Sequence, residues 1–328
     1  MDIRKYLEFA ESLKLVRNEN LEDSSGNKRI DDIYTDLLPQ NGIINKVNLP
    51  RTTILIGRKG TGKSTIFQKS IKDKEKVKDD ICLYIDVKTL YDNSTPKISV
   101  GDTNVFSTEE LKQYLIYKNF INEIIIEIKN RLNQKLDKTF IEKVLRLDNE
   151  KYQQIVAELN QIESSVDDVF KKIDISLISS ISNVVEDTSG NDSKLNCNLS
   201  KMPSIGIEDT DSTKKTIKKE FNSIFVNYLD IKKNLIVNLL RIRDILGLKH
   251  LYIYLDDYSE IDENAQMLFM EWIIAPLNNL ADNFIKFKIA TYPKRFYYGK
   301  LDNQKIDEIS LDFFDAFYTY KNISFPLS

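Results

Sequence analysis

The chain has 328 residues, of which 41% are hydrophobic and 30% charged, so it can form one large domain or two small ones with a sizeable core. Its formal net charge of -3 excludes a global basic field and does not support nonspecific nucleic-acid binding by the whole chain. One histidine and two distant cysteines, Cys82 and Cys197, exclude chemistry that needs several histidines and do not support a zinc site or a disulfide framework.

The N-terminal 45 residues are predicted to be a helical segment. Residues 1–20 have helical apolar spacing and a charged surface, unlike a signal peptide, and no run approaches the ~18 apolar residues of a membrane span. We therefore predict a cytoplasmic protein without membrane association. A loop at 21–29 and a short helix at 30–38 follow, and the sequence PQNG is predicted to end that helix.

Apolar runs that alternate with helical patterns predict a parallel α/β sheet of about five strands. The strands are expected at 52–56, 81–87, 250–255 and 284–291, with a fifth at 308–311 or 323–325. One helix is expected from Lys63 to about Lys72. Another is expected at 263–281, where Pro276 lacks the N–H of an interior turn and should kink or split the helix.

The alternation of apolar runs with single helices is interrupted between the second and third strands. Helical patterns at 108–136, 139–174 and 214–246 predict one long, mostly helical insertion, and 175–212 is read either as a β-hairpin or as a mobile loop. The predicted domains are therefore a core, made of 46–95 and 248–328, and an insertion, made of 96–247.

The stretch GRKGTGKS fits the phosphate-loop pattern G-x-x-x-x-G-K-[ST], with a strand before it and a helix after it. Backbone N–H groups of such a loop and of the following helix N-terminus point at a phosphate. Lys63 would bridge the β- and γ-phosphates, Ser64 would bind Mg²⁺ and Thr65 would lie near the α-phosphate. The predicted nucleotide-binding residues are Gly57, Lys59, Gly60, Thr61, Gly62, Lys63, Ser64 and Thr65.

An acid pair at the end of the third strand supplies the carboxylates that such a site needs. Asp256 is predicted to hold Mg²⁺ together with Ser64, and Asp257 to orient or deprotonate the attacking water. Glu260 is a weaker candidate for that second role. Thr291, at the end of the fourth strand, is predicted to sense the γ-phosphate, and Arg295 is either a phosphate contact or a surface residue.

Several nucleotide-binding classes lack support in the sequence. The guanine-specific pattern [NT]KxD is missing, because the early stretch NKVN has no acid, and an LSGGQ-like signature is also missing. The long gap between Lys63 and Asp256 is atypical of a compact small-molecule kinase. These observations favour Mg²⁺-dependent ATP hydrolysis on a sheet with an additional strand between the two motifs.

The segments GRKGTGKST, YIDVKTLY, YLDDYSE and KIATYPKRFYYGKLD, in that order, resemble the AAA+/STAND side of the P-loop ATPases. They are similar in particular to bacterial ATPases of the origin-recognition-complex-like group, which includes ATPases of anti-phage defence systems. The resemblance covers about 40–95 and 248–312. It implies that the glycine-rich loop is a Walker A motif, that Asp256 and Asp257 form the Walker B motif, and that Thr291 is the first sensor.

The resemblance also implies partners. It suggests a homo-oligomer or an effector-protein complex in which ATP hydrolysis drives a conformational or assembly change. Such ATPases usually continue into a helical lid, so we expect a lid that is missing or reduced to 312–322, and either a chain that is part of a longer protein or a site that another subunit completes. Ile30 and Tyr34 are expected near the adenine pocket. The alternatives are a nucleotide-gated scaffold with little turnover and, less favoured, a DNA-associated ATPase.

Overall fold

A computed structural model describes residues 30–94, 109–137, 148–188 and 229–312, with short pieces at 140, 219 and 222–225. Several predictions therefore lie outside the described residues. They are the helix at 1–20, the loop at 21–29, the alternative fifth strand at 323–325 and nearly all of the reduced lid at 312–322. Within the described ranges no helix combines the length and the apolar composition needed to cross a bilayer.

The predicted α/β class and five-stranded parallel sheet are confirmed. The strands are ordered β2-β3-β4-β1-β5, and every neighbouring pair is parallel. Their bounds are β1 Thr52–Ile56, β2 Asp80–Asp86, β3 His250–Asp256, β4 Ile285–Thr291 and β5 Ile306–Ser310. The first four lie within one residue of the predicted runs, and the fifth uses the first of its two candidates. Because β4 lies between β1 and β3, the carboxyl ends of these three strands meet at one sheet edge.

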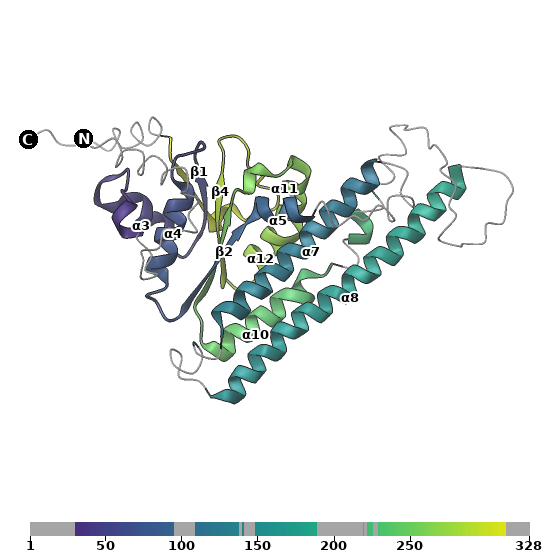
Figure 1. The fold of residues 1–328 in the computed structure, drawn as a ribbon, viewed down its shortest axis with the longest axis horizontal. Helices are drawn as coiled ribbons and strands as arrows, with labels where there is room; N and C mark the ends of the chain where they lie inside the picture. The colour runs from purple at the N-terminus through teal and green to yellow at the C-terminus, as the bar shows by residue number, and fades with distance from the viewer. Residues whose placement is uncertain are drawn as a thin grey trace, which may run out of the picture.

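One face of the sheet is covered by α3 (Gly42–Val47) and α4 (Lys63–Lys74), as Figure 1 shows. Ile43, Ile66 and Phe67 from these helices pack with Leu55 and Ala290 of the sheet. Burial of these apolar side chains holds α4, and with it the loop that precedes it, against the sheet.

The opposite face is covered by the helices that join β2 to β3 and by those that join β3 to β4 (Figure 1). The first set is α5 Val87–Ser94, α7 Glu109–Lys135, α8 Asn149–Thr188, η4 Lys232–Ile236 and α10 Val237–Leu246. Within this set α8 forms an outer layer, which packs on α7 and α10. The second set is the 3-10 turn η5 Tyr258–Glu260, α11 Glu263–Phe269, η6 Met270–Ile274 and α12 Ala275–Leu280. A last 3-10 turn, η7 Asn303–Lys305, precedes β5.

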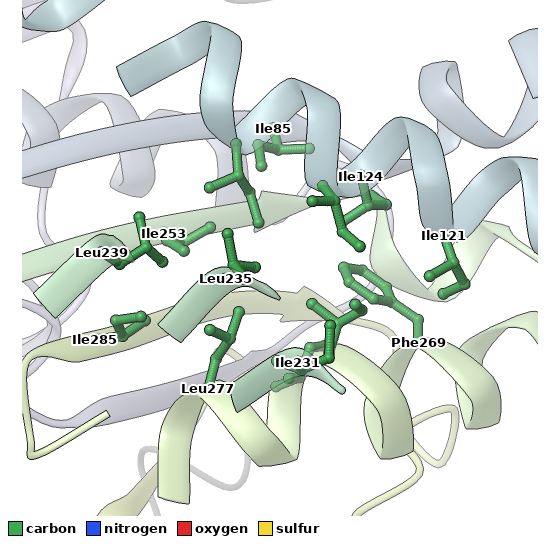
Figure 2. Packing of buried hydrophobic residues seen from close by; sticks show 14 of the residues in the cluster. Ile85, Ile121, Ile124, Ile231, Leu235, Leu239, Ile253, Phe269, Leu277 and Ile285 are labelled. Carbon is green, nitrogen blue, oxygen red and sulfur yellow. The ribbon is translucent and has the colours of Figure 1, made fainter. Parts of the chain in front are cut away.

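These helices and the sheet share one hydrophobic core. Figure 2 shows Ile124 of α7 and Leu235 of η4 packed near Ile85, Ile253 and Ile285 of three neighbouring strands. All five side chains are at most 1% exposed. The helices of the predicted insertion therefore do not form a core of their own, since they supply the cover that the strands need on this face.

The N-terminal part of the described chain differs from the prediction of one helix at 30–38. Helix α2 spans only Ile30–Ile33, and α3 is an unpredicted helix beyond a 3-10 turn, η2, at Pro39–Asn41. The reason is a distant cap: the Asp36 carboxylate accepts hydrogen bonds from the N–H groups of Ile43 and Ile44. The PQNG stretch therefore leads into a helix instead of only ending one.

The β-hairpin or loop expected at 175–212 is wrong for 175–188, where α8 continues as helix to Thr188. The apolar residues Leu177, Ile181 and Val184 recur every three or four positions, which extends the helical pattern beyond Ile173. Residues 189–212 lie outside the described part of the chain.

The split expected at Pro276 is confirmed. A π-helical turn, η6, separates α11 from α12, and Pro276 occupies the beginning of α12. Proline fits the first turn of a helix, where its missing N–H would have no intrahelical acceptor.

Candidate functional site

The predicted phosphate loop joins the end of β1 to the first turn of α4. Gly62, the residue before α4, has φ +81°, a left-handed conformation that side chains rarely adopt. A Cβ on Gly57 would lie 2.4 Å from Thr61 Oγ1. The Thr61 hydroxyl donates to Arg58 O at 2.9 Å, which closes the loop on itself. The shape of the loop therefore requires glycine at these two positions.

Lys63 folds back into the loop. Its Nζ donates to Gly57 O at 2.7 Å and to Arg58 O at 3.0 Å. The same atom lies 4.6 Å from the centroid of the Tyr292 ring. Ser64 and Thr65 follow in the first turn of α4, where backbone N–H groups and the helix dipole favour an anion.

The charges of three acids act on the Lys63 ammonium. Burial lowers the pKa of Lys63, and the negative charges of Asp256, Asp257 and Glu260 oppose that shift. The side chain is only 9% exposed, so desolvation outweighs these attractions. The sequence-predicted lysine and acid pair are therefore close enough to interact electrostatically, although at least 193 positions separate them in the sequence.

Asp256 ends β3 and is nearly buried, at 3% exposed. Its Oδ2 accepts a hydrogen bond from the Tyr84 hydroxyl at 2.7 Å, and its Oδ1 accepts one from the Asp257 N–H at 3.0 Å. Burial and the adjacent Asp256 charge raise the pKa of Tyr84, so this hydroxyl stays protonated as a donor. Tyr84 comes from β2 and was not among the sequence-predicted site residues.

Asp257 has φ +51°, in the left-handed region, directly after β3. An aspartate tolerates this region better than most residues, but the conformation still stores some strain. Its N–H is directed at the Asp256 carboxylate, and its charge acts on both Lys63 and Tyr292. The backbone turn thus places two successive carboxylates at the same sheet edge.

Glu260, the weaker sequence candidate, has described contacts with three side chains. The Tyr292 hydroxyl donates to its Oε1, and Lys88 Nζ donates to its Oε2 at 3.2 Å. Lys59 Nζ lies 3.8 Å from Oε1, which places this predicted nucleotide-binding residue at the acid side of the loop. The Tyr292 hydrogen bond is the main cause that lowers the pKa of Glu260.

Thr291, the predicted sensor, ends β4 and is fully buried. Its hydroxyl lies 3.3 Å from Tyr292 O and 3.2 Å from Arg295 O, so it bonds to carbonyls of the loop that follows. Its own carbonyl accepts from the Gly57 N–H at 3.0 Å. Thr291 thus fixes the loop that carries Tyr292, while Arg295 lies exposed on that loop.

A cavity of about 390 Å³ lies on the other side of the phosphate loop. Its walls come from the segment before β1, from the loop and α4, and from the residue after β5. They include Tyr34, Leu37, Ile43, Gly60, Thr65 and Leu311. The Tyr34 hydroxyl donates to Asp36 Oδ2 at 2.7 Å, which fixes that wall. Tyr34 therefore lines this cavity, whereas Ile30 is buried and is not among its lining residues.

A larger cavity of about 540 Å³ lies between α4, the edge strand β2 and α7. Its walls include Glu75, Cys82, Asp86, Arg131 and Lys135, but no residue of the glycine-rich loop. Size alone would favour this cavity as the ligand site. The smaller one is the better candidate for a nucleotide base, because Gly60, Thr61 and Gly62 form part of its wall.

Comparison of the chain with protein-family models, with curated proteins and with solved structures finds no match.

Proposed function

We propose that this chain binds Mg²⁺–ATP at the loop Gly57–Thr65 and hydrolyses it. The observation that carries the proposal is the meeting of Lys63 with the acid pair Asp256 and Asp257 at one edge of a parallel sheet. The loop before Lys63 has the left-handed glycine and the close packing that a phosphate cradle needs.

The residues at the sheet edge fit a magnesium ion. Mg²⁺ prefers carboxylate and hydroxyl oxygens and keeps several waters. Each oxygen of Asp256 accepts one hydrogen bond and retains lone-pair capacity, and Ser64 supplies a hydroxyl from the first turn of α4. When bound, the ion would neutralise charge on the phosphates.

The remaining roles follow from position. Lys63 would leave its loop carbonyls to hold the β- and γ-phosphates, and Asp257 would orient the attacking water as a general base. The cavity beside Tyr34 would hold the adenine base. Thr291 would fix the loop next to the terminal phosphate. The output would be a conformational or assembly change in an anti-phage defence complex.

A nucleotide-gated scaffold with little turnover is the second candidate. It is favoured by the engagement of the charged groups: Lys63 already contacts two carbonyls and an aromatic ring, and Asp256 already accepts from Tyr84. A site of this kind can bind nucleotide through slow rearrangement and hold it.

Phosphate release from Mg²⁺–ATP separates the two candidates. Asp257→Asn keeps a residue that tolerates a left-handed backbone but removes the base, so hydrolysis should fall about 100-fold or more. Asp282→Asn is a matched control, because Asp282 also has a positive φ, of +49°, in the turn that precedes β4. Equal wild-type and Asp257→Asn rates would refute the base assignment. Tight binding without phosphate release would favour the scaffold.

A further inference from the structure

The Lys63 ammonium already has three interaction partners, which are two backbone carbonyls and an aromatic ring. An ammonium carries three N–H donors, and two of them are directed at the carbonyls of Gly57 and Arg58 inside the loop. The remaining side is covered by the Tyr292 ring, whose centroid lies 4.6 Å from Nζ. A phosphate oxygen can reach this ammonium only by replacing one of these contacts.

Tyr292 is held in that place by two further contacts. Its N–H donates to Ser259 Oγ at 2.9 Å, and its hydroxyl donates to Glu260 Oε1. Glu260 is in turn bonded to Lys88 at the beginning of α5, through Oε2 at 3.2 Å. The ring is thus fixed between the phosphate-loop lysine and a carboxylate on the turn that follows β3.

The two kinds of contact lie on different sides of Lys63. The loop carbonyls belong to the backbone of the phosphate loop, which would hold a β-phosphate. Tyr292 lies on the side of the acids, since its hydroxyl donates to Glu260 Oε1 and the charges of Asp257 and Asp256 also act on it. That is the side on which a terminal phosphate would be held between Lys63 and the acid pair.

We propose that Tyr292 competes with the terminal phosphate of a nucleoside triphosphate for Lys63, so that a triphosphate must displace the ring whereas a diphosphate need not. The proposal rests on the proposed function and adds a residue that determines the preference between the two nucleotides. Displacement of the ring also breaks its bond to Glu260 and leaves that carboxylate to Lys88 and Lys59.

The turn that holds Glu260 is joined to the helices of the other face. Two residues further on, Asp262 Oδ1 accepts from Tyr117 of α7 at 3.0 Å and from the Ala265 N–H at 3.0 Å. Tyr91 of α5 donates to the same carboxylate. The contact that a terminal phosphate would break therefore lies on the turn to which α5, α7 and α11 are bonded.

The test compares the affinities of the full chain for Mg²⁺-ADP and for the Mg²⁺ complex of the β,γ-imido analogue of ATP, measured by calorimetry. Tyr292→Leu keeps an apolar side chain but removes the π face. It should raise affinity for the triphosphate relative to ADP by about 2- to 30-fold, the range expected from one cation–π contact. Tyr292→Phe keeps the ring and loses the bond to Glu260, so its change should be smaller and in the same direction.

Tyr297→Leu is the matched control, because Tyr297 also donates to a glutamate, Glu271, and belongs to the same loop, but has no contact with Lys63 among those described. Its affinity ratio should stay within about twofold of wild type. An unchanged or reduced ratio in Tyr292→Leu would overturn the inference. Failure of the wild-type chain to bind either nucleotide would instead overturn the proposed function, and the inference with it.

Discussion

The hydrogen bond between Tyr84 and Asp256 should contribute measurably to the free energy of unfolding. Asp256 is only 3% exposed, and its carboxylate receives the Tyr84 hydroxyl at 2.7 Å and the Asp257 N–H at 3.0 Å. Tyr84→Phe removes the first of these donors with little change in shape. The buried carboxylate then keeps one of the two described partners.

A hydrogen bond to a charged group contributes about 1.5–3 kcal/mol, and its loss in a buried place is not replaced by water. Tyr84→Phe should therefore lower the free energy of unfolding by about 1.5–3 kcal/mol at pH 7.5. Urea unfolding followed by circular dichroism measures this, provided that the slope of the free energy against urea concentration is unchanged.

Tyr298→Phe is the control, because the Tyr298 hydroxyl donates to Glu308 at an exposed position. Its effect should stay within about 0.5 kcal/mol. If Tyr84→Phe also changes the free energy of unfolding by less than that amount, the Tyr84–Asp256 bond does not stabilise the sheet edge.

Three further predictions concern the loop, the core and a buried lysine. Gly57→Ala should weaken ATP binding, because the new Cβ would meet Thr61 Oγ1 at 2.4 Å, and adding Thr61→Ala should restore part of the affinity in a calorimetric titration. Ile124→Ala should lower the free energy of unfolding by about 2–5 kcal/mol. Ile175→Ala changes a side chain that is 69% exposed, so it should change this free energy by less than about 0.5 kcal/mol. Equal effects of the two substitutions would contradict the shared core. Burial lowers the pKa of Lys288 from 10.5 to about 7, so above pH 7 the unfolded chain binds a proton that the folded chain lacks, and stability should rise from pH 7 to about 9. Each pH unit contributes at most about 1.4 kcal/mol, and Lys288→Met should flatten the dependence measured by urea unfolding.

The strands were predictable because each is a short apolar run that ends in a polar residue or a glycine. β3 shows this best, since the run ends at Asp256 and each of its residues from Leu251 on is buried. The loop Gly57–Ser64 was predictable because a strand, the glycine pattern and a helix occur together in a few residues. In these places local sequence and tertiary burial point to the same structure.

The errors have two causes, which are a cap that is not adjacent to its helix in sequence and a pattern with two interpretations. Helix α3 depends on Asp36, six residues before its first turn, and a search for adjacent caps does not find it. The serine-rich stretch after Ile173 has both alternating and helical spacing, and the structure continues α8 to Thr188.

In the candidate site, too, the contacts between distant residues were not predictable from the sequence. Lys63, Asp256 and Asp257 were predictable from motifs, whereas Tyr84 and Tyr292 were not. Tyr84 reaches Asp256 across 172 positions because β2 and β3 are neighbours in the sheet. Tyr292 could have been suspected only from its place directly after Thr291, at the edge where β4 ends between β1 and β3.

The most direct test of the central claim is equilibrium binding of Mg²⁺–ATP to the full chain and to Lys63→Ala. The variant removes the only cation that the loop carbonyls of Gly57 and Arg58 hold in the described part of the chain. A charge-assisted contact to phosphate contributes about 1.5–3 kcal/mol, so affinity should fall by roughly 10- to 150-fold. Equal affinity of the two proteins for ATP, or no binding by the wild-type chain, would contradict the assignment of Gly57–Thr65 as a nucleotide site.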